Sequence, residues 1–563
     1  LRFMGGARRS AHHEGAKLQE DWTTRLYRRI MAPMLREVRY RWLFLGVVVV
    51  LLLASLSMLY FQAVIVKMLP FDNKNEMEVV LQMPDGTPLE QTQAVAQQLS
   101  GYLSRQPEVA NVESYVGAAA PYNFNGLIRH YFLRTQPNQA DLQVNLVDDS
   151  RRSQQSHAIA LRLRPGLDAI ADPLHGRVTV AEIPPGPPVL QTLVAEIYGP
   201  DYAQQIQLAA RVKQVFVSTP GVVDVDWFVR DPESRLTLQP DPQKAALSGV
   251  ALPDVAETLQ IALEGRTAGL AHMPREQEAV PIRVQLARAD RSGVPELLRL
   301  QAPAASGGVV PLSELVTVQR GVVAQPLMHK DLRPVVYVLG DVAGGAESPA
   351  YAIFAMNKKL QQLTGPDGRP PNIFMSGVPS NTRSFAVRWD GEWDTTIRVF
   401  RDLGIAFAAV MVLIYVLVVF WFRSYKTPLV ILAPIPLTLI GIIPGHWVLG
   451  AFFTATSMIG FIAGAGIIVR NSIILVDFIE LRRAQGVPLA RAVVDAGAVR
   501  FRPMLLTAAA VIVGASVILP DPIFQGLAIS LMAGEIASTL ISRLAVPVLY
   551  FMAWRGSEPP VPA

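Results

Sequence analysis

The chain has 563 residues, of which 51% are hydrophobic and 17% are charged. A soluble domain is about one-quarter charged, so this composition favours a membrane protein. Cysteine is absent from the sequence, which excludes disulfides, thiolate metal sites and cysteine nucleophiles. The formal net charge of +5 is modest, and the placement of the charges along the chain is more informative than their sum.

The N-terminal segment, residues 1–41, is basic and lacks the short apolar core of a signal peptide. Because it also begins at Leu1 and not at a methionine, we expect the chain to be cut from a longer protein. Residues 21–41 predict a helix whose apolar residues lie near one face: Trp22, Leu26, Ile30 and Leu35. Such a helix would lie on the cytoplasmic membrane surface, and a solvated linker is the alternative interpretation.

Six apolar stretches are long enough to cross about 30 Å of hydrocarbon. The first, residues 42–66, predicts the first transmembrane helix. Five more follow a long polar region, at residues 399–422, 428–449, 453–478, 504–519 and 524–552. Short loops join these five, so residues 399–552 predict a five-helix bundle followed by a cytoplasmic tail, 553–563. A buried helix of a soluble protein would explain any one of these stretches, but not all six together.

The lysine and arginine residues predict the orientation of the spans, because these residues concentrate in cytoplasmic loops. The segment before the first span and the loops at 423–426 and 479–503 are rich in them. The loops on the other side, at 446–451 and 520–522, contain neither lysine nor arginine. Both termini are therefore predicted inside the cell, and residues 67–398 outside the cytoplasm.

The outer region contains a weak internal repeat of strand, turn, helix and strand. One copy begins at residues 77–83 and the other at residues 193–199. Two further candidate strands, 142–147 and 335–339, complete the copies into two ferredoxin-like βαββαβ subdomains.

A separate segment interrupts the second copy, with a helix at 252–263 and short strands near 282–286 and 309–312. An insertion of this kind usually forms its own small domain. The predicted division assigns 67–190 to the first subdomain, 191–234 with 323–395 to the second, and 235–322 to the insertion. The predicted fold is a polytopic α-helical membrane protein with six transmembrane helices and a large α+β outer region.

Ionisable residues at bilayer depth are costly, so each one needs a partner or a function. Arg470 precedes Glu480, at the cytoplasmic end of its span, by ten residues, which places it about 15 Å deep and near the midplane. That depth is a long reach for a snorkelling side chain, which is the alternative. We therefore predict that Arg470, which is followed by Asn471, is a partnered functional charge.

Three more polar residues lie within the predicted spans. Thr507 lies one to two turns inside its helix, where a hydroxyl usually bonds its own backbone unless a neighbour carries a charge. Glu535 and Arg543 are eight residues apart on the last helix, so about 80° separates them. We expect each to form an ion pair across helices, and a proton-binding carboxylate is the alternative for Glu535.

Four stretches in the same order resemble the resistance-nodulation-division (RND) superfamily of proton-driven exporters, specifically the C-terminal half of its hydrophobe/amphiphile multidrug branch. They are residues 310–316, 466–478, 500–507 and 546–551. The resemblance extends over residues 21–554. It implies six helices per half, two porter subdomains in the outer region, and a docking subdomain inserted into the second of them.

The resemblance also implies a proton relay. In this family a lysine on the fourth helix of this half, and an arginine and a threonine on the fifth, face two aspartates on the first half. By position these three are Arg470, Arg500 and Thr507. Arginine does not release its proton, so Arg470 would act as a fixed counter-charge. No aspartate pair occurs in these spans, so the acids must lie on an N-terminal half or in a separate polypeptide, and the chain alone should not pump.

The family further implies a secondary active transporter, not an enzyme, with no cofactor beyond the proton-motive force. It implies a homotrimer in the inner membrane of a Gram-negative bacterium, with a periplasmic adaptor and an outer-membrane channel. Drugs or other amphiphiles would bind between the porter subdomains and move outward by alternating access. Tyr115, Tyr122 and Phe124 are candidate stacking residues, whereas Trp227 and Phe228 are expected in strand cores.

Other functions stay open at this point. A metal exporter of the same superfamily would use methionine and histidine ligands, but Met83, Met273 and Met328 are scattered. A lipid-sensing or receptor relative would keep the fold without proton coupling. A membrane enzyme is not favoured, because no metal motif, nucleophile elbow or phosphate-binding glycine loop occurs. Juxtamembrane charge explains Arg8 and Arg9 more simply than nucleic-acid binding does.

Overall fold

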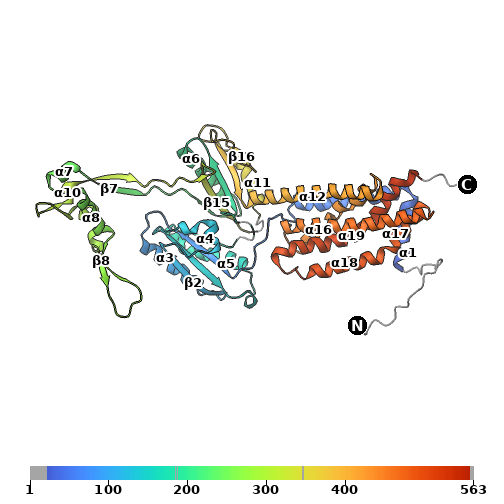
Figure 1. Ribbon diagram of the computed structural model, residues 1–563, viewed down its shortest axis with the longest axis horizontal. Coiled ribbons are helices and arrows are strands. Elements are labelled where there is room, and N and C mark those ends of the chain that lie inside the picture. The colour runs from blue at the N-terminus through green and yellow to red at the C-terminus, as the bar shows by residue number, and fades with distance from the viewer. Residues whose placement is uncertain (1–21, 184–185, 187, 345–347, 558–563) are drawn as a thin grey trace. The chain divides into compact units, whose positions relative to one another are not determined.

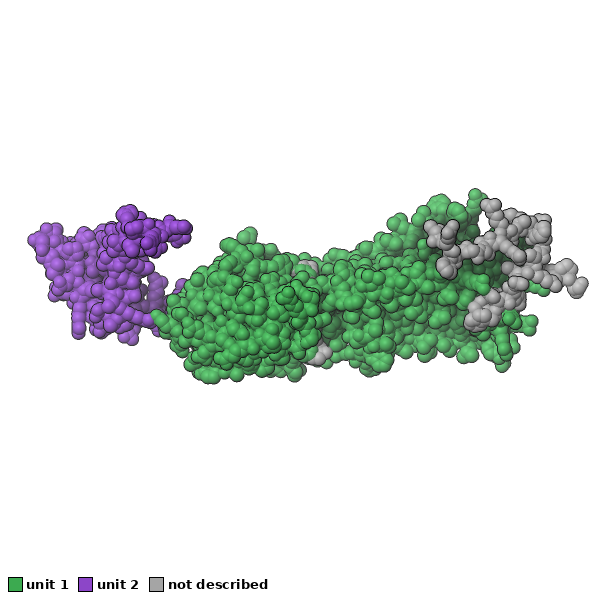
Figure 2. Space-filling model, turned by 90° about the horizontal axis from the view of Figure 1, so that it is seen from below, with its two compact units in different colours: residues 1–229, 327–563 green, residues 230–326 purple. Residues whose placement is uncertain are grey.

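The computed structural model describes residues 22–183, 186, 188–344 and 348–557 (Figure 1). The chain divides into two compact units, of which Arg230–Pro326 is the smaller (Figure 2). The larger unit contains the long helices and two multistranded β-sheets. The basic residues Arg8 and Arg9 and the end of the predicted tail, 558–563, lie outside the described residues.

Six helical segments are long and apolar enough to cross a membrane, as the sequence predicted. Four of them are single helices: α2 (Val38–Tyr60), α12 (Glu392–Phe422), α16 (Ala455–Ala484) and α19 (Pro522–Trp554). The third segment is divided into α13 (Thr427–Leu432), α14 (Pro434–Leu437) and α15 (Leu439–Val448). The fifth consists of α17 (Leu489–Val499) and α18 (Phe501–Ser516).

Several predicted boundaries were wrong, each for a local reason. The first span ends at Tyr60, and Val66, its predicted last residue, forms a β-bridge with Phe453. The second begins at Glu392, because the polar first turns of α12 continue directly from a strand. Prolines interrupt the third span, since proline lacks the N–H that an α-helix needs. Residues 489–499, predicted as part of a polar loop, form the amphipathic helix α17.

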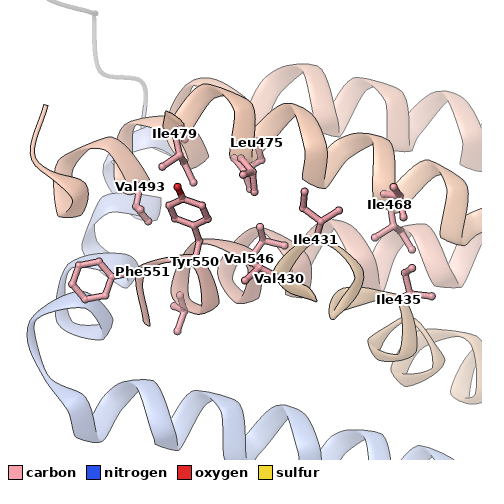
Figure 3. Packing of buried hydrophobic residues seen from close by; sticks show 14 of the residues in the cluster. Val430, Ile431, Ile435, Ile468, Leu475, Ile479, Val493, Val546, Tyr550 and Phe551 are labelled. Atoms are coloured by element: carbon pink, nitrogen blue, oxygen red, sulfur yellow. The ribbon is translucent and has the colours of Figure 1, made fainter. Parts of the chain in front are cut away.

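The helices of the bundle pack through apolar side chains and close glycine contacts. Leu475 and Ile479 of α16 lie beside Val546 and Tyr550 of α19 in one buried cluster (Figure 3). A Cβ atom on Gly460 would lie 2.9 Å from the Leu527 carbonyl oxygen, so α16 approaches α19 closely there. The absence of a side chain at Gly460 permits this close approach.

Helix α1 (Trp22–Arg36) precedes α2 and packs against α17 and α19. Its buried residues, Tyr27, Met31 and Leu35, recur every four positions and so form one helix face. Leu26 and Ile30, which the sequence predicted on the apolar face, are exposed. Apolar side chains that the bundle leaves uncovered can face a membrane surface, so the interpretation of α1 as a helix on the membrane surface stays a prediction.

The first sheet has four antiparallel strands in the order β2-β3-β1-β4. They are β1 (Glu76–Gln82), β2 (Val109–Val116), β3 (Gln139–Leu146) and β4 (Arg177–Ala181). Helix α3 (Leu89–Leu103) connects β1 to β2, and α5 (Ser156–Ala171) connects β3 to β4, which gives a βαββαβ order. The short helix α4 (Phe124–Arg129) lies between β2 and β3. We call this part, residues 76–181, the first sheet domain.

The second sheet repeats this order with one added edge strand: β16-β17-β5-β15-β6. Its elements are β5 (Leu193–Tyr198), α6 (Tyr202–Val217), β6 (Val222–Trp227), β15 (Val336–Val342), α11 (Pro349–Leu360), β16 (Asn372–Phe374) and β17 (Ala386–Gly391). The sequence predicted β15 but missed β17, which continues into α12 through Gly391. A φ of 70° makes this a glycine position. We call residues 193–227 with 336–391 the second sheet domain.

The smaller unit starts and ends in a long two-stranded ribbon of β7 (Ser234–Pro240) and β12 (Val316–Val322). Its hairpins pair β8 (Arg266–Ala271) with β9 (Val280–Val284), and β10 (Gln301–Pro303) with β11 (Val309–Pro311). Its helices are α7 (Pro242–Leu247), α8 (Leu252–Leu263), α9 (Val294–Leu298) and α10 (Leu312–Leu315). The helix predicted at 252–263 is confirmed as α8. Between this unit and β15 lie two short strands of the larger unit, β13 (His329–Lys330) and β14 (Arg333–Pro334).

Candidate functional site

Arg470 lies near the middle of α16, on a helix face that the described part of the chain leaves uncovered. Its side chain is exposed, and the residues four positions away on either side are exposed as well. This uncovered face consists of Ala463, Gly466, Arg470, Ile474 and Asp477. A Cβ atom on Gly466 would meet nothing within 4 Å. The predicted charge at mid-helix is therefore directed away from the bundle of this chain.

Glu535 is a buried carboxylate on the neighbouring helix α19. It is 3% exposed, and Arg470 is the cation that acts on it. Its hydrogen-bond partner is the Thr539 hydroxyl. No ion pair among the described residues joins Glu535 to Arg470, so the ion pair predicted for Glu535 is not formed. Asn471, next to Arg470, is buried on the other side of α16.

Arg500 directly precedes α18, and Thr507 lies within that helix. The Arg500 guanidinium lies 5.3 Å from the centroid of the Phe478 ring, which belongs to α16. The Thr507 hydroxyl donates to the Met504 carbonyl oxygen at 2.8 Å, the backbone bond that the sequence offered as the commoner case. Within the described residues, no hydrogen bond or ion pair connects either side chain to Arg470.

Arg543 lies elsewhere on α19 and takes a different partner from the one expected. Its side chain is 6% exposed, and the guanidinium lies 3.7 Å from the centroid of the Phe501 ring. The Tyr27 hydroxyl donates to the Arg543 carbonyl oxygen at 3.2 Å. Among the described residues the Arg543 side chain forms no ion pair, so the prediction of an ion pair across helices was wrong for this residue. The face of the Phe501 ring takes the place of the expected carboxylate.

The candidate stacking residues lie on the first sheet domain. The Tyr122 ring is 76% exposed and lies 5.9 Å from Phe132, a residue that the sequence interpretation did not select. Phe124 begins α4 and is also exposed. Tyr115 is on β2, and its hydroxyl donates to Glu113 at 3.0 Å. The two residues expected in strand cores are partly buried: Trp227 and Phe228.

A small charged cleft that the sequence did not reveal lies within the larger unit, with a cavity volume of about 50 Å³. Its charged lining includes Lys67 after α2, Arg129 of α4, Asp341 of β15 and Glu392 of α12. Burial alone would raise the pKa of Asp341, but Arg129 and the Thr192 N–H hold it below its ordinary value. These residues are far apart in sequence, so no local pattern predicts that they meet. The one feature of the sequence that could have indicated the cleft was Asp341, an aspartate inside an apolar strand.

Comparison with known proteins identifies the family. Residues 8–553 match the AcrB/AcrD/AcrF family. The chain belongs to this family. Transporters of the AcrB/AcrD/AcrF family are part of the RND superfamily, so the resemblance carried by the sequence motifs is confirmed.

Individual members of the family include both drug and metal resistance proteins. The chain is 25% identical to the multidrug resistance protein MdtC of Yersinia enterocolitica over 81% of this chain and 42% of that protein. It is 26% identical to the cobalt-zinc-cadmium resistance protein CzcA of Cupriavidus metallidurans over 66% of this chain and 34% of that protein. It is 24% identical to the swarming motility protein SwrC of Bacillus subtilis over 60% of this chain and 31% of that protein.

A solved structure supports the same fold. The crystal structure of a heavy metal efflux pump superposes with a TM-score of 0.75 at 20% identity, over 94% of this chain and 52% of that one. The chain thus spans about half the length of the pump and less than half of each curated relative named above.

Proposed function

We propose that the chain is the C-terminal half of a proton-driven RND exporter that moves amphiphilic organic molecules out of the cell. The observation that carries this proposal is the uncovered face of α16, with Arg470 near its centre. A guanidinium directed toward hydrocarbon costs several kcal/mol, so this face needs a polar partner from outside the chain. An N-terminal half with two carboxylates on a facing helix would supply that partner.

In this proposal Arg470 is a fixed cation that changes partners. Arginine stays protonated, so the protons move on the acidic residues of the other half. When those acids are charged they hold Arg470, and when they are protonated they release it toward Glu535, a buried carboxylate of this chain on which Arg470 acts. Arg500 and Thr507 at the start of α18 would follow the same change, since α18 packs on α19.

The outer parts of the chain would convert this movement into transport. The two βαββαβ sheets correspond to ferredoxin-like porter subdomains, and the smaller unit to a docking subdomain. Because β17 runs directly into α12, a shift of that helix moves the second sheet. We assign the chain to the inner membrane of a Gram-negative bacterium with the outer region in the periplasm. The complete protein would form a homotrimer with an adaptor and an outer-membrane channel.

Organic amphiphiles are favoured as substrates by exposed aromatic side chains on the first sheet domain, including Tyr122 and Phe124. Among the described residues, no three histidine, aspartate or glutamate side chains gather as a metal site requires. Metal export is the second candidate, because CzcA and the heavy metal efflux pump are among the relatives. A receptor that does not transport would have no acids opposite Arg470.

The test uses the full-length protein that carries this sequence, expressed in a pump-deficient Gram-negative host. We expect raised resistance to amphiphilic dyes and drugs and unchanged tolerance of zinc, cobalt and cadmium. Arg470→Ala should abolish the resistance at equal expression, whereas Arg491→Ala, an exposed arginine on α17, should preserve it. Resistance to metals alone would replace the substrate assignment, and full activity of Arg470→Ala would refute the relay.

A further inference from the structure

Three arginines of the first sheet domain pair with three aspartates of the second. Arg164 of α5 pairs with Asp224 of β6, and both side chains are largely buried. The other two pairs are Arg129–Asp341 at 3.6 Å, which is buried, and Arg177–Asp226 at 2.8 Å, which is about half exposed. All the cations are on one domain and all the anions on the other, so the two surfaces are electrostatically complementary.

The backbone at Asp224 is shaped to make this contact. Leu339 of β15 pairs with Asp226 of β6, and Asp341 of β15 pairs with Val223 of β6. Between these two pairs β15 advances by two residues, whereas β6 advances by three. The extra residue makes a β-bulge in β6, and bulges redirect a side chain from its strand. Asp224 has a φ of 51°, in the left-handed region that residues with a Cβ atom seldom adopt. Such strain persists only where the surroundings hold it in place.

The charges that face Asp224 come from three elements besides its own strand. Helix α5 supplies Arg164 and Asp168, β15 supplies Asp341, and α4 supplies Arg129. Burial raises the pKa of Asp224, whereas the positive charge of Arg164 lowers it. Burial is the stronger of the two effects, so the pKa of Asp224 is raised to about 6. The closed interface therefore contains a carboxyl group that binds a proton far more tightly than it would in water.

We propose that Asp224 and Arg164 form a latch between the two sheet domains, and that a proton on Asp224 tightens it. The two residues are positioning residues, because they set the relation of the domains on either side of the charged cleft. Protonated Asp224 keeps a hydrogen-bond acceptor for Arg164 but no longer carries a desolvated charge. This inference concerns the movement of the domains and stands apart from the proposal of export.

The direction of the pH effect follows from linkage. When the domains separate, Asp224 enters water and its pKa returns to the ordinary 3.8, below its value of about 6 in the closed form. The form with the higher pKa is favoured as pH falls through it, so acid closes the interface and alkali weakens it. Between pH 7 and pH 5 the ratio of closed to open molecules should rise about tenfold, with little change above pH 7.

The experiment measures distances between spin labels in the purified full chain in lipid nanodiscs. Because the sequence has no cysteine, two labels can be placed without background, at Ala169→Cys on α5 and Gln214→Cys on α6. We expect a short-distance population that grows about tenfold relative to the long one between pH 7 and pH 5. Asp224→Asn mimics the protonated side chain, so this variant should be closed at both pH values.

Asp226→Asn is the matched control, since it alters an exposed pair of the same chemistry at the same interface. It should retain the pH response of the parent protein. Arg164→Gln removes the cation that lowers the pKa of Asp224, so its closing should begin at higher pH. Distances independent of pH in the parent, or an unaltered response in both Asp224→Asn and Arg164→Gln, would overturn the latch. Loss of the pH response in Asp226→Asn would assign that response to the interface as a whole, and this result would also overturn the latch.

Discussion

Arg28 of α1 and Asp495 of α17 lie 3.1 Å apart, joined by a guanidinium nitrogen and one carboxylate oxygen. The second oxygen of Asp495 lies 3.0 Å from Arg482 of α16. One carboxylate thus connects three helices at the same end of the bundle. The contact also explains why α1 buries the face that contains Tyr27, because Arg28 must point toward α17 at the same time.

Replacing Asp495 by asparagine should loosen α1 without unfolding the bundle. Partly exposed ion pairs contribute about 0.2–1 kcal/mol each, so the loss of two should be small for the whole chain. Because α1 depends on one of them for its docking, its amide hydrogens should exchange up to about fivefold faster, as mass spectrometry can measure. Asp402→Asn is the control, since Asp402 pairs with the adjacent Arg401 on an exposed surface. Equal exchange in both variants would contradict the role of Asp495.

The contact of Arg543 with Phe501 predicts that the aromatic ring is needed for stability. The Nε and Nη2 atoms of Arg543 have no hydrogen-bond partner among the described residues, so the ring is its main electrostatic partner. Phe501→Leu keeps an apolar side chain but removes this partner, at a cost of about 2 kcal/mol for a desolvated cation. The apparent Tm of the purified chain should fall by several degrees, and Phe501→Tyr should restore it. Phe420→Leu, at a ring that is 77% exposed, should have little effect.

The sequence allowed the spans to be predicted because an apolar run of about 20 residues matches the thickness of a bilayer and exceeds what a soluble core usually needs. Helix α8 could be predicted for a similar reason, because the spacing of its apolar residues and the residues at its two ends are local features of the sequence. Strand β17 was missed because Arg388 and Asp390 make it look polar. In the structure Arg388 contacts the buried Glu196 of β5, and that compensation is visible only after the strands pair.

The candidate site was predictable only in part. The depth of Arg470 follows from its distance to the helix end, which is a local measure. The uncovered face around it depends on how the other helices pack, and no local pattern carries that information. The partner of Arg543 is an aromatic ring 42 residues away, and an expectation based on charge alone selects a carboxylate instead.

Glu78 on β1 predicts a pH dependence of stability in the first sheet domain. Burial, with a smaller effect of nearby Asp141, raises the pKa of Glu78 to about 7 from 4.5. A folded-state pKa above the unfolded one means that the stabilisation is full below pH 4.5 and is lost as pH rises through 7. Glu78→Gln should therefore raise the apparent Tm at pH 8 but not at pH 5. Glu113→Gln, on the exposed side of β2, should change it at neither pH.

Arg470→Lys and Arg470→Gln separate the charge at this position from the identity of the side chain. If Arg470 is a fixed counter-charge, the lysine variant of the full-length protein keeps the cation and should retain most of its efflux. The glutamine variant has no charge to hold the acids of the other half, so its efflux should fall at least about tenfold, equivalent to about 1.4 kcal/mol of lost coupling. Lysine can lose its proton when it is buried, whereas arginine cannot. The lysine variant should therefore lose efflux at alkaline pH at which the parent still works. A dye-efflux assay over pH 6–9 at matched expression measures both effects, and an active glutamine variant would remove the charge from the mechanism.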